Sequence, residues 1–271
     1  HQWCRANPLW QARPLPPAQM QAMRTHAHTL VQPQGFTGEV APVRTEGAVG
    51  RWRARSRPGT RDSCLQTSLP LYSALEDSPL QTERSKAIYF EVTLIGAGQA
   101  ARFGRRAPSS LEEADAGVAL GFFAPPYPGW RLPGWQRGSL GVHGDDGRRY
   151  INDPFGGLDF TEPFRFGETL GIGMVWKPQT SDAPPTYNEA SGRTQSSPLA
   201  VEVVFTRDGC KAGSWNLHEE LDAERSEGGT KGLDGECDVF AAVGVFGQVE
   251  VEVCFSPRQW KYAPPADRGG W

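Results

Sequence analysis

The sequence predicts an all-β protein, a sandwich of two antiparallel sheets, from three observations. Eight segments of five to ten residues are rich in β-branched and aromatic side chains, which is the composition of short strands. Thirty-two glycines and 23 prolines supply many turns, as a sandwich requires. Hardly any stretch has the apolar period of a helix, so two packed sheets are the architecture that remains.

The predicted strands follow one another from the middle of the chain to its end. Residues 249–255 alternate valine with acidic residues, which predicts one buried and one solvated face. Asp146-Gly147 and Asp208-Gly209 stand between strand segments and are typical of tight hairpin turns. The predicted strands cover 86–95, 117–124, 139–143, 148–152, 168–176, 200–207, 239–246 and 249–255. Their alternating positions predict an inward-facing core of Phe90, Val92, Leu120, Phe122, Leu170, Ile172, Val203, Phe205, Val251 and Val253.

Residues 1–61 differ in charge and pattern, and we expect an irregular, loosely attached basic N-terminal arm there. They hold nine arginines and two glutamates, a net charge of +7, whereas residues 62–271 carry −10. Prolines leave room only for a short helix within 18–30. The run from Arg51 to Arg57 alternates arginine with other residues. It fits a solvated edge strand or linker, or alternatively a contact with anionic lipid.

Composition also excludes several classes of protein. The net charge of −3 argues against a general nucleic-acid binder. Five widely spaced cysteines form no C-x-x-C pattern, so we expect no metal, no cofactor and free thiols in a reducing, cytosolic environment. His143 beside Asp145 could suggest acid–base chemistry, but no nucleophile motif, P-loop or dinucleotide fingerprint accompanies it. We therefore expect a protein that is not an enzyme.

Three polar segments interrupt the strands, and they define the expected domain organisation. Insertions at about 96–116, 177–199 and 216–236 lack periodic apolar residues and are predicted to be surface loops. The domain itself is expected over 62–262, followed by a tail at 263–271. No stretch has the length of a membrane helix, so any membrane attachment is expected to come from a segment outside this chain.

A long central motif resembles the SPRY domain family. It runs through PYPGWRLPGW at 126–135, SLGVHGDDG at 139–147 and NDPFGG at 152–157. Within that family it is most similar to fungal membrane-anchored adaptors that deliver endosomal and vacuolar cargo to a NEDD-family HECT ubiquitin ligase. The same motifs are also similar to Ran-binding protein M. The resemblance implies a concanavalin-like jelly roll over about 62–262 and a domain that binds other proteins.

The motif supplies candidate residues for a protein-binding rim. Pro133-Gly134 predicts a rigid turn that fixes the direction of Trp135. Trp135 is then either a plug under the loop or an exposed anchor for a partner, since tryptophan is enriched at binding hot spots. Asp145 to Gly147 fits a hairpin turn, with Asp145 as an alternative ligand-facing carboxylate. We expect the rim to be bordered by residues 97–115 and to comprise Arg131, Trp135, His143 and Asp145.

The second insertion contains a short motif that predicts a separate partner. Pro184, Pro185 and Tyr187 form a Pro-Pro-x-Tyr sequence, the polyproline-II ligand of WW domains. The resembled adaptors recruit a WW-containing ligase, so a WW domain of a NEDD-family HECT ubiquitin ligase is an expected partner beside a protein cargo. A looser match at 69–72 ending in Tyr72 lies in a strand-like segment and is expected to be structural.

The sequence favours one of two functions, and sugar or lipid binding by the rim of the sandwich stays open beside them. The first is an adaptor at the cytosolic face of endosomal or vacuolar membranes. The alternative is a scaffold subunit of a multi-subunit ubiquitin ligase of the Ran-binding protein M type.

Overall fold

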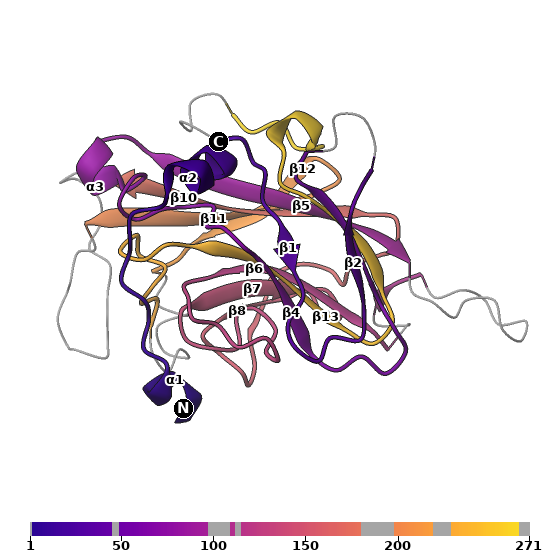
Figure 1. Ribbon diagram of the computed structural model, residues 1–271. Coiled ribbons are helices and arrows are strands. Elements are labelled where there is room, and N and C mark those ends of the chain that lie inside the picture. Colours follow the sequence, from indigo (N-terminus) through magenta and orange to yellow (C-terminus); the bar gives the residue numbers. More distant parts are fainter. Residues whose placement is uncertain are drawn as a thin grey trace, which may run out of the picture.

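The computed structural model describes residues 2–44, 49–96, 109–111, 115–179, 198–218 and 229–265. Within these residues two seven-stranded antiparallel sheets pack face to face, which confirms the predicted β-sandwich. Sheet A has the order β1-β4-β13-β6-β7-β8-β9, and sheet B has the order β12-β11-β10-β5-β14-β3-β2. In Figure 1 the upper layer contains β5, β10 and β11, and the lower layer contains β6, β7 and β8.

The elements have the following bounds. The helices are α1 Gln2–Ala6, α2 Pro17–Arg24 and α3 Pro79–Thr82, with a short 3-10 helix at Pro257–Gln259. The first seven strands are β1 Leu30–Val31, β2 Gly38–Pro42, β3 Arg51–Ser56, β4 Ser63–Thr67, β5 Lys86–Gly96, β6 Gly117–Phe123 and β7 Ser139–His143. The others are β8 Arg148–Ile151, β9 Leu158–Asp159, β10 Thr169–Pro178, β11 Leu199–Arg207, β12 Cys210–Asn216, β13 Phe240–Phe246 and β14 Glu250–Cys254.

All eight predicted strands are present, with ends that differ from the predicted ones by no more than two residues. The predicted hairpin at Asp208-Gly209 is also confirmed. These two residues have φ angles of 47° and 81°, the left-handed pair that a two-residue hairpin between β11 and β12 requires. Local sequence signals were sufficient here because strand composition and turn chemistry act over a few neighbouring residues.

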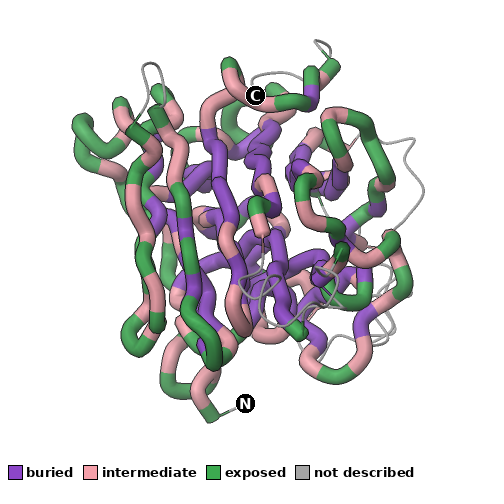
Figure 2. Tube along the Cα trace, turned by 90° about the vertical axis from the view of Figure 1, so that its right-hand side faces the viewer, coloured by how far each residue is buried: buried purple, intermediate pink, exposed green. Residues whose placement is uncertain are grey.

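The core lies between the sheets and contains every residue predicted for it. Phe90 of β5 and Phe122 of β6 are fully buried and meet across the two layers, edge to face, with ring centroids 5.5 Å apart. The inner faces of β10, β11 and β14 complete this core. Figure 2 shows the buried residues running through the central strands, with exposed residues on the connections.

The prediction of an irregular, loosely attached N-terminal arm is wrong. Strand β1 joins sheet A beside β4, and β2 and β3 extend sheet B beside β14. The sandwich therefore begins near residue 30 rather than at 62. The local pattern could not reveal this, because the partner strands of β1 and β3 lie far away in the sequence and pairing with them is what orders the segment.

The arginines of β3 show how that pairing works. Arg53 and Arg55 stand opposite Glu252 and Glu250 of β14, with N–O distances of 3.2 Å and 2.8 Å. Arg51 pairs with Glu252 as well. Opposite charges on facing positions favour one register of two strands. The arginine run therefore belongs to β3, a strand of sheet B, and its arginines lie on the solvated face of that sheet. A contact of these arginines with anionic lipid would have to compete with the ion pairs to Glu250 and Glu252.

The outer faces of both sheets are covered by the chain ends. On sheet A, the Trp10 amide donates to the Pro125 carbonyl (2.9 Å), and Arg137 donates to the Asn7 carbonyl (2.7 Å). Figure 1 places α1 below the lower layer. The N-terminal segment is therefore tied at Asn7 and Trp10 to the loop between β6 and β7.

On sheet B, a buried carboxylate holds the C-terminal segment. Glu91 is 3% exposed and accepts hydrogen bonds from the Tyr89 hydroxyl (3.0 Å) and from the amides of Lys261 and Tyr262 (both 2.9 Å). A buried carboxylate needs such donors. Residues 260–262 are thus part of the fold.

The insertions predicted as surface loops are partly buried. Trp176 donates its indole N–H to the Leu233 carbonyl, and the Tyr72 hydroxyl donates to the Gly235 carbonyl, each at 2.9 Å. Leu233 is 1% exposed, and Leu111 of the first insertion is fully buried. The surface-loop prediction is wrong for these residues, since isolated apolar anchors in a polar segment leave no periodic signal.

The docking of the N-terminal segment predicts a pH dependence of stability. His28 is 3% exposed, its Nε2 donates to the Pro70 carbonyl (3.1 Å), and burial lowers the pKa of its imidazole to about 4. The pKa of histidine in the unfolded chain is about 6.5. As the pH falls below this pKa, the unfolded chain binds a proton at His28 and the folded chain does not, so the unfolded state is favoured. Between pH 7.5 and pH 5, His28 alone should lower the free energy of unfolding by about 2 kcal/mol.

Urea melts of wild type and His28→Gln at these two pH values check this. The substitution should reduce the difference in stability between the two pH values by about that amount. An undiminished pH difference in His28→Gln would assign the acid sensitivity to other buried groups, such as His143.

Candidate functional site

Three glycines on neighbouring strands leave a flat area on the outer face of sheet A. They are Gly121 of β6, Gly141 of β7 and Gly244 of β13. A Cβ atom at Gly141 would lie 2.4 Å from the carbonyl oxygen of Pro133, and one at Gly244 would lie 2.8 Å from the side chains of Leu132 and Pro133. Only glycine allows this close approach. The glycines of the three strands therefore let the segment 132–134 pack directly on the sheet.

That segment forms the turn predicted from Pro133-Gly134. Gly134 has φ of +95°, and the Trp135 amide donates to the Leu132 carbonyl at 3.2 Å. Proline at the second position and a left-handed glycine at the third are typical of a type II turn. The prediction of a rigid turn that directs Trp135 is confirmed.

Three hydrogen bonds hold the carbonyls of this turn. The Tyr127 hydroxyl donates to Leu132 (2.6 Å), and Nε2 of His143 donates to Pro133 (2.9 Å). The Asp153 amide donates to Gly134 (2.9 Å). Every carbonyl from 132 to 134 thus has a donor, which fixes the turn on the sheet.

Trp135 lies between the two alternatives that its sequence context left open. Its side chain is half-buried and packs on the rings of His143 and Tyr150, with centroids 5.1 Å and 6.3 Å away. Its indole nitrogen is buried and has no hydrogen-bond partner among the described residues. Trp135 is therefore neither a core plug nor a free anchor, and its exposed part forms the floor of a surface.

The other predicted rim residues divide into exposed and buried. Arg131 and Asp145 are exposed, whereas His143 is only 2% exposed, and burial lowers the pKa of its imidazole. Placing the His143 side chain on the exposed rim is wrong: it supports the 132–134 turn from below. Arg131, His143 and Asp145 all lie near the carboxyl group of Asp62. Burial raises the pKa of Asp62, Arg131 and His143 act to lower it, and Asp145 acts to raise it.

The hairpin interpretation holds for Asp146, while Asp145 is a surface carboxylate. Asp146 accepts from the Arg148 amide (2.9 Å) and from the Tyr150 hydroxyl (2.8 Å), which closes the β7–β8 turn. Asp145 precedes it and points to solvent at the same turn. It is therefore available to a partner with a positive charge.

Sequence reasoning missed the most exposed aromatic residue near this surface, Phe155. Its ring is 86% exposed. The buried carboxylate of Asp153 accepts from the amides of Phe155 (2.8 Å) and Gly157 (2.9 Å), so the turn that carries the ring is fixed from inside. The available signal was the N-D-P-F-G-G sequence, in which an Asx turn and two glycines flank a single phenylalanine.

These turns form one surface because their backbones are joined. The Asp153 amide bonds to Gly134, so the turn that presents Phe155 abuts the turn that presents Trp135. A fixed aromatic residue beside exposed charges is the composition of protein-binding surfaces.

Comparison with known proteins supports the same conclusion. No family model matches the chain. A SPRY domain-containing protein of Schizosaccharomyces pombe is 27% identical over 207 residues, 76% of this chain and 40% of that protein. Protein ssh4 of Aspergillus clavatus is 28% identical over 149 residues, 54% of this chain and 23% of that protein. The chain is therefore similar in sequence to SPRY domain-containing proteins.

SPRY domains are protein-interaction modules, generally without catalytic activity. The crystal structure of a human SPRY domain is 20% identical, with a TM-score of 0.43, and the match covers 80% of this chain and 97% of that one. The chain spans less than half the length of the two curated relatives described above.

The surface continues past Trp130, which is 59% exposed and contacts Trp3 edge to face at 6.2 Å. A groove of about 480 Å³ separates Tyr127 and Trp130 from residues 31–34 of the N-terminal segment. A second aromatic side chain thus faces solvent beside the fixed turn.

The WW-ligand motif of Pro184, Pro185 and Tyr187 lies outside the described residues. The strands on either side of its insertion pair to their ends, with Pro178 of β10 opposite Leu199 of β11. Most of residues 97–115, the predicted border of the rim, also lie outside the described part. By contrast, Tyr72 of the looser motif is fully buried and stacks on Trp176 at 4.3 Å, which confirms its structural role.

The described part of the chain contains neither a candidate metal site nor a membrane-spanning helix. No group of three or more histidine, cysteine, aspartate or glutamate side chains is arranged to hold a metal ion there. Of the helices that the structure describes, none combines the length and apolar character needed to cross a bilayer.

Proposed function

We propose that this SPRY domain is the cargo-binding part of an adaptor that presents endosomal or vacuolar membrane proteins to a WW-domain HECT ubiquitin ligase for ubiquitin-dependent sorting. The observation that carries the proposal is Phe155, 86% exposed on a turn whose backbone is held by the buried Asp153. An exposed aromatic ring on a turn whose backbone is already fixed gives a partner with a matching pocket affinity at little entropic cost.

The charged neighbours of the ring supply selectivity. Arg131 and Asp145 are exposed on adjoining turns and carry opposite charges. Charges at the border of an interface mainly set association rate and partner choice, while buried aromatic anchors supply the affinity. Cargo is thus expected to insert an apolar pocket over Phe155 and to place complementary charges on either side.

The ligase half of the function rests on Pro184, Pro185 and Tyr187. Two prolines preset the extended polyproline-II conformation, and the tyrosine fills a second pocket of the WW domain. One such motif binds a WW domain with a dissociation constant of about 10⁻⁵ to 10⁻⁶ M. The resemblance of the central motif to membrane-anchored ligase adaptors supports this assignment.

Membrane attachment would complete the adaptor. The proposed place of action is the cytosolic face of endosomal or vacuolar membranes, with the anchor supplied by a segment outside this chain. Holding adaptor and cargo on the same membrane raises their effective concentration, so that weak contacts to cargo and ligase act together.

Tyr187→Ala is expected to weaken WW-domain binding at least about tenfold, because it empties the tyrosine pocket. Titration of a NEDD-family WW domain into wild type and Tyr187→Ala by calorimetry measures this. Thr186→Ala is the matched control, since the variable position of the motif carries no pocket contact and binding should be retained. Phosphorylation of Tyr187 should also block binding, because a charge near −2 does not enter an apolar pocket.

Identical isotherms for wild type and Tyr187→Ala, or no binding by wild type at about 100 µM, would exclude a WW-mediated role. The motifs shared with Ran-binding protein M would then favour the alternative, a scaffold subunit of a multi-subunit ubiquitin ligase.

A further inference from the structure

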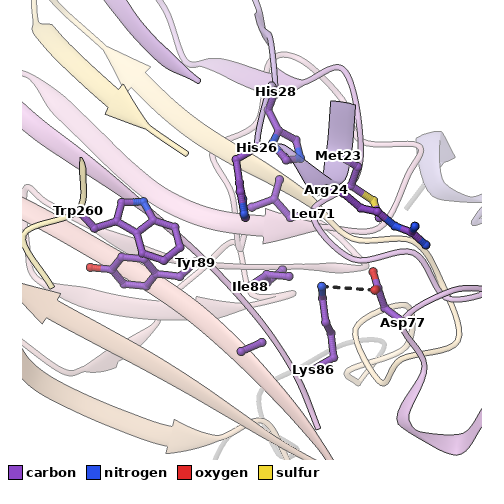
Figure 3. Close-up of a pocket in the computed structure, with 11 residues that line it drawn as sticks. Met23, Arg24, His26, His28, Leu71, Asp77, Lys86, Ile88, Tyr89 and Trp260 are labelled. Atoms are coloured by element: carbon purple, nitrogen blue, oxygen red, sulfur yellow. Dashed lines mark ion pairs between the residues drawn. The ribbon is translucent and has the colours of Figure 1, made fainter. Parts of the chain in front are cut away.

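A small cavity lies on the other side of the molecule from the Trp135 turn, where the chain ends meet sheet B. It has a volume of about 180 Å³. Its walls come from the end of α2, from residues 71–77, from the start of β5 and from Trp260 near the C-terminus. Figure 3 shows these side chains around the cavity. Four segments distant in sequence thus build one site.

One part of the cavity is apolar and flat. Met23, Leu71 and Ile88 line it and are themselves buried. The rings of Tyr89 and Trp260 meet edge to face, with centroids 4.7 Å apart, and form an aromatic wall. Such a lining favours a ligand with a compact, planar apolar body.

The other part of the cavity carries more positive than negative charge. Lys86 Nζ lies 3.3 Å from Oδ1 of Asp77, whose Oδ2 accepts from the Ser73 amide (2.9 Å), so both oxygens of this carboxylate are engaged. Figure 3 marks the Lys86–Asp77 pair. Arg24 is exposed and pairs with no carboxylate that the structure describes. One positive charge therefore remains without a counter-charge in the lining.

A buried imidazole completes the polar part. His28 lines the cavity and is 3% exposed. Its Nε2 must donate to the Pro70 carbonyl (3.1 Å), which leaves Nδ1 as the free position. Nδ1 is buried and makes no hydrogen bond of standard geometry in the described part of the chain, and the backbone of His26 lies near the ring. Buried polar atoms in folded proteins are normally satisfied, and a bound group would satisfy this one.

We propose that this cavity binds a small organic monocarboxylate, with its planar apolar body against Trp260 and its carboxylate near Arg24, Lys86 and His28. A monoanion matches the single unpaired positive charge. An inorganic anion would leave the apolar half of the cavity without contacts. This ligand is separate from the protein cargo proposed for the Phe155 surface.

The proposal predicts that binding takes up a proton. Burial lowers the pKa of His28 to about 4, and the charges of His26 and Lys86 add to the decrease, while the backbone of Pro70 and of His26 acts against it. A carboxylate beside the ring acts in the opposite direction, so the imidazolium, with Nδ1–H as a donor, becomes favoured in the complex. Affinity should therefore increase as the pH falls from 7 to 5.

The test is titration of the full chain with benzoate, followed by NMR of the histidine ring signals. Benzoate should shift the His26 and His28 resonances, and neutral benzamide of the same shape should shift them at least about tenfold more weakly. Arg24→Gln should weaken benzoate at least about threefold. The control is Arg258→Gln, which removes an exposed charge outside the cavity. His28→Gln should reduce the gain in affinity at pH 5, and His26, the other imidazole in the lining, accounts for any gain that remains.

N-acetyl-glycyl-phenylalanine, with a free C-terminal carboxylate, and its amide test whether the carboxylate belongs to a peptide end. Tighter binding by the free acid than by benzoate would support the site and identify a peptide as its source. Three results would overturn the proposal: no shift of either histidine up to about 20 mM benzoate, equal binding of benzoate and benzamide, or equal affinity of the two arginine variants.

Discussion

Phe205→Ala is expected to lower the free energy of unfolding by about 3–5 kcal/mol, as full burial of a large ring implies. Phe205 is 0% exposed on the inner face of β11. Its ring stacks on Phe164 at 5.7 Å and meets Phe160 edge to face at 5.8 Å. Removing the Phe205 ring leaves a cavity, and the surrounding strands and the segment 160–164 cannot fill it without a shift of their backbone.

Urea denaturation of wild type and Phe205→Ala measures this loss. Phe155→Ala is the matched control, because it deletes the same atoms from a ring that is 86% exposed and should change stability by no more than about 0.5 kcal/mol. A loss below about 1 kcal/mol for Phe205→Ala would contradict the packing of β11 described above.

Phe155→Ala is in turn expected to weaken cargo capture at least about 30-fold, equivalent to about 2 kcal/mol, the threshold of a binding hot spot. The Asp153 carboxylate that holds the turn keeps its backbone partners in this variant. The melting temperature should therefore stay unchanged, and the loss should come from the interface alone.

Quantitative capture from solubilised endosomal and vacuolar membranes, by immobilised wild type and variants, measures the effect. Leu80→Ala removes another exposed apolar side chain, 57% exposed on α3, and should leave capture unchanged. Trp135→Ala should reduce both capture and stability, since its ring packs on His143 and Tyr150. Equal capture by wild type and Phe155→Ala would remove Phe155 as the anchor of the proposed site.

The candidate site could be predicted only in part. The Pro133-Gly134 turn was predictable because its geometry is set by two adjacent residues, and so was the Asp146 hairpin. The burial of His143 was not, because it depends on which loop covers β7. The exposure of Phe155 depends likewise on Asp153 satisfying its turn from within, so that the ring is left outside.

The sequence by itself determined the sandwich, eight of its strands and the ten core residues, because strand composition, alternation and turn chemistry act between near neighbours. It also determined the family resemblance, through the motif at 126–157. Tertiary structure alone decided that residues 30–56 belong to the sheets, that Glu250 and Glu252 face the arginines of β3, and that Glu91 fastens the residues after 257. The contacts of Glu91, Glu250 and Glu252 join residues about 170 to 200 positions apart, and β1 pairs with β4 across the turns and strands between Leu30 and Thr67. A local pattern carries no information about such pairs, because the partner is chosen by loop closure and by the burial that closure permits.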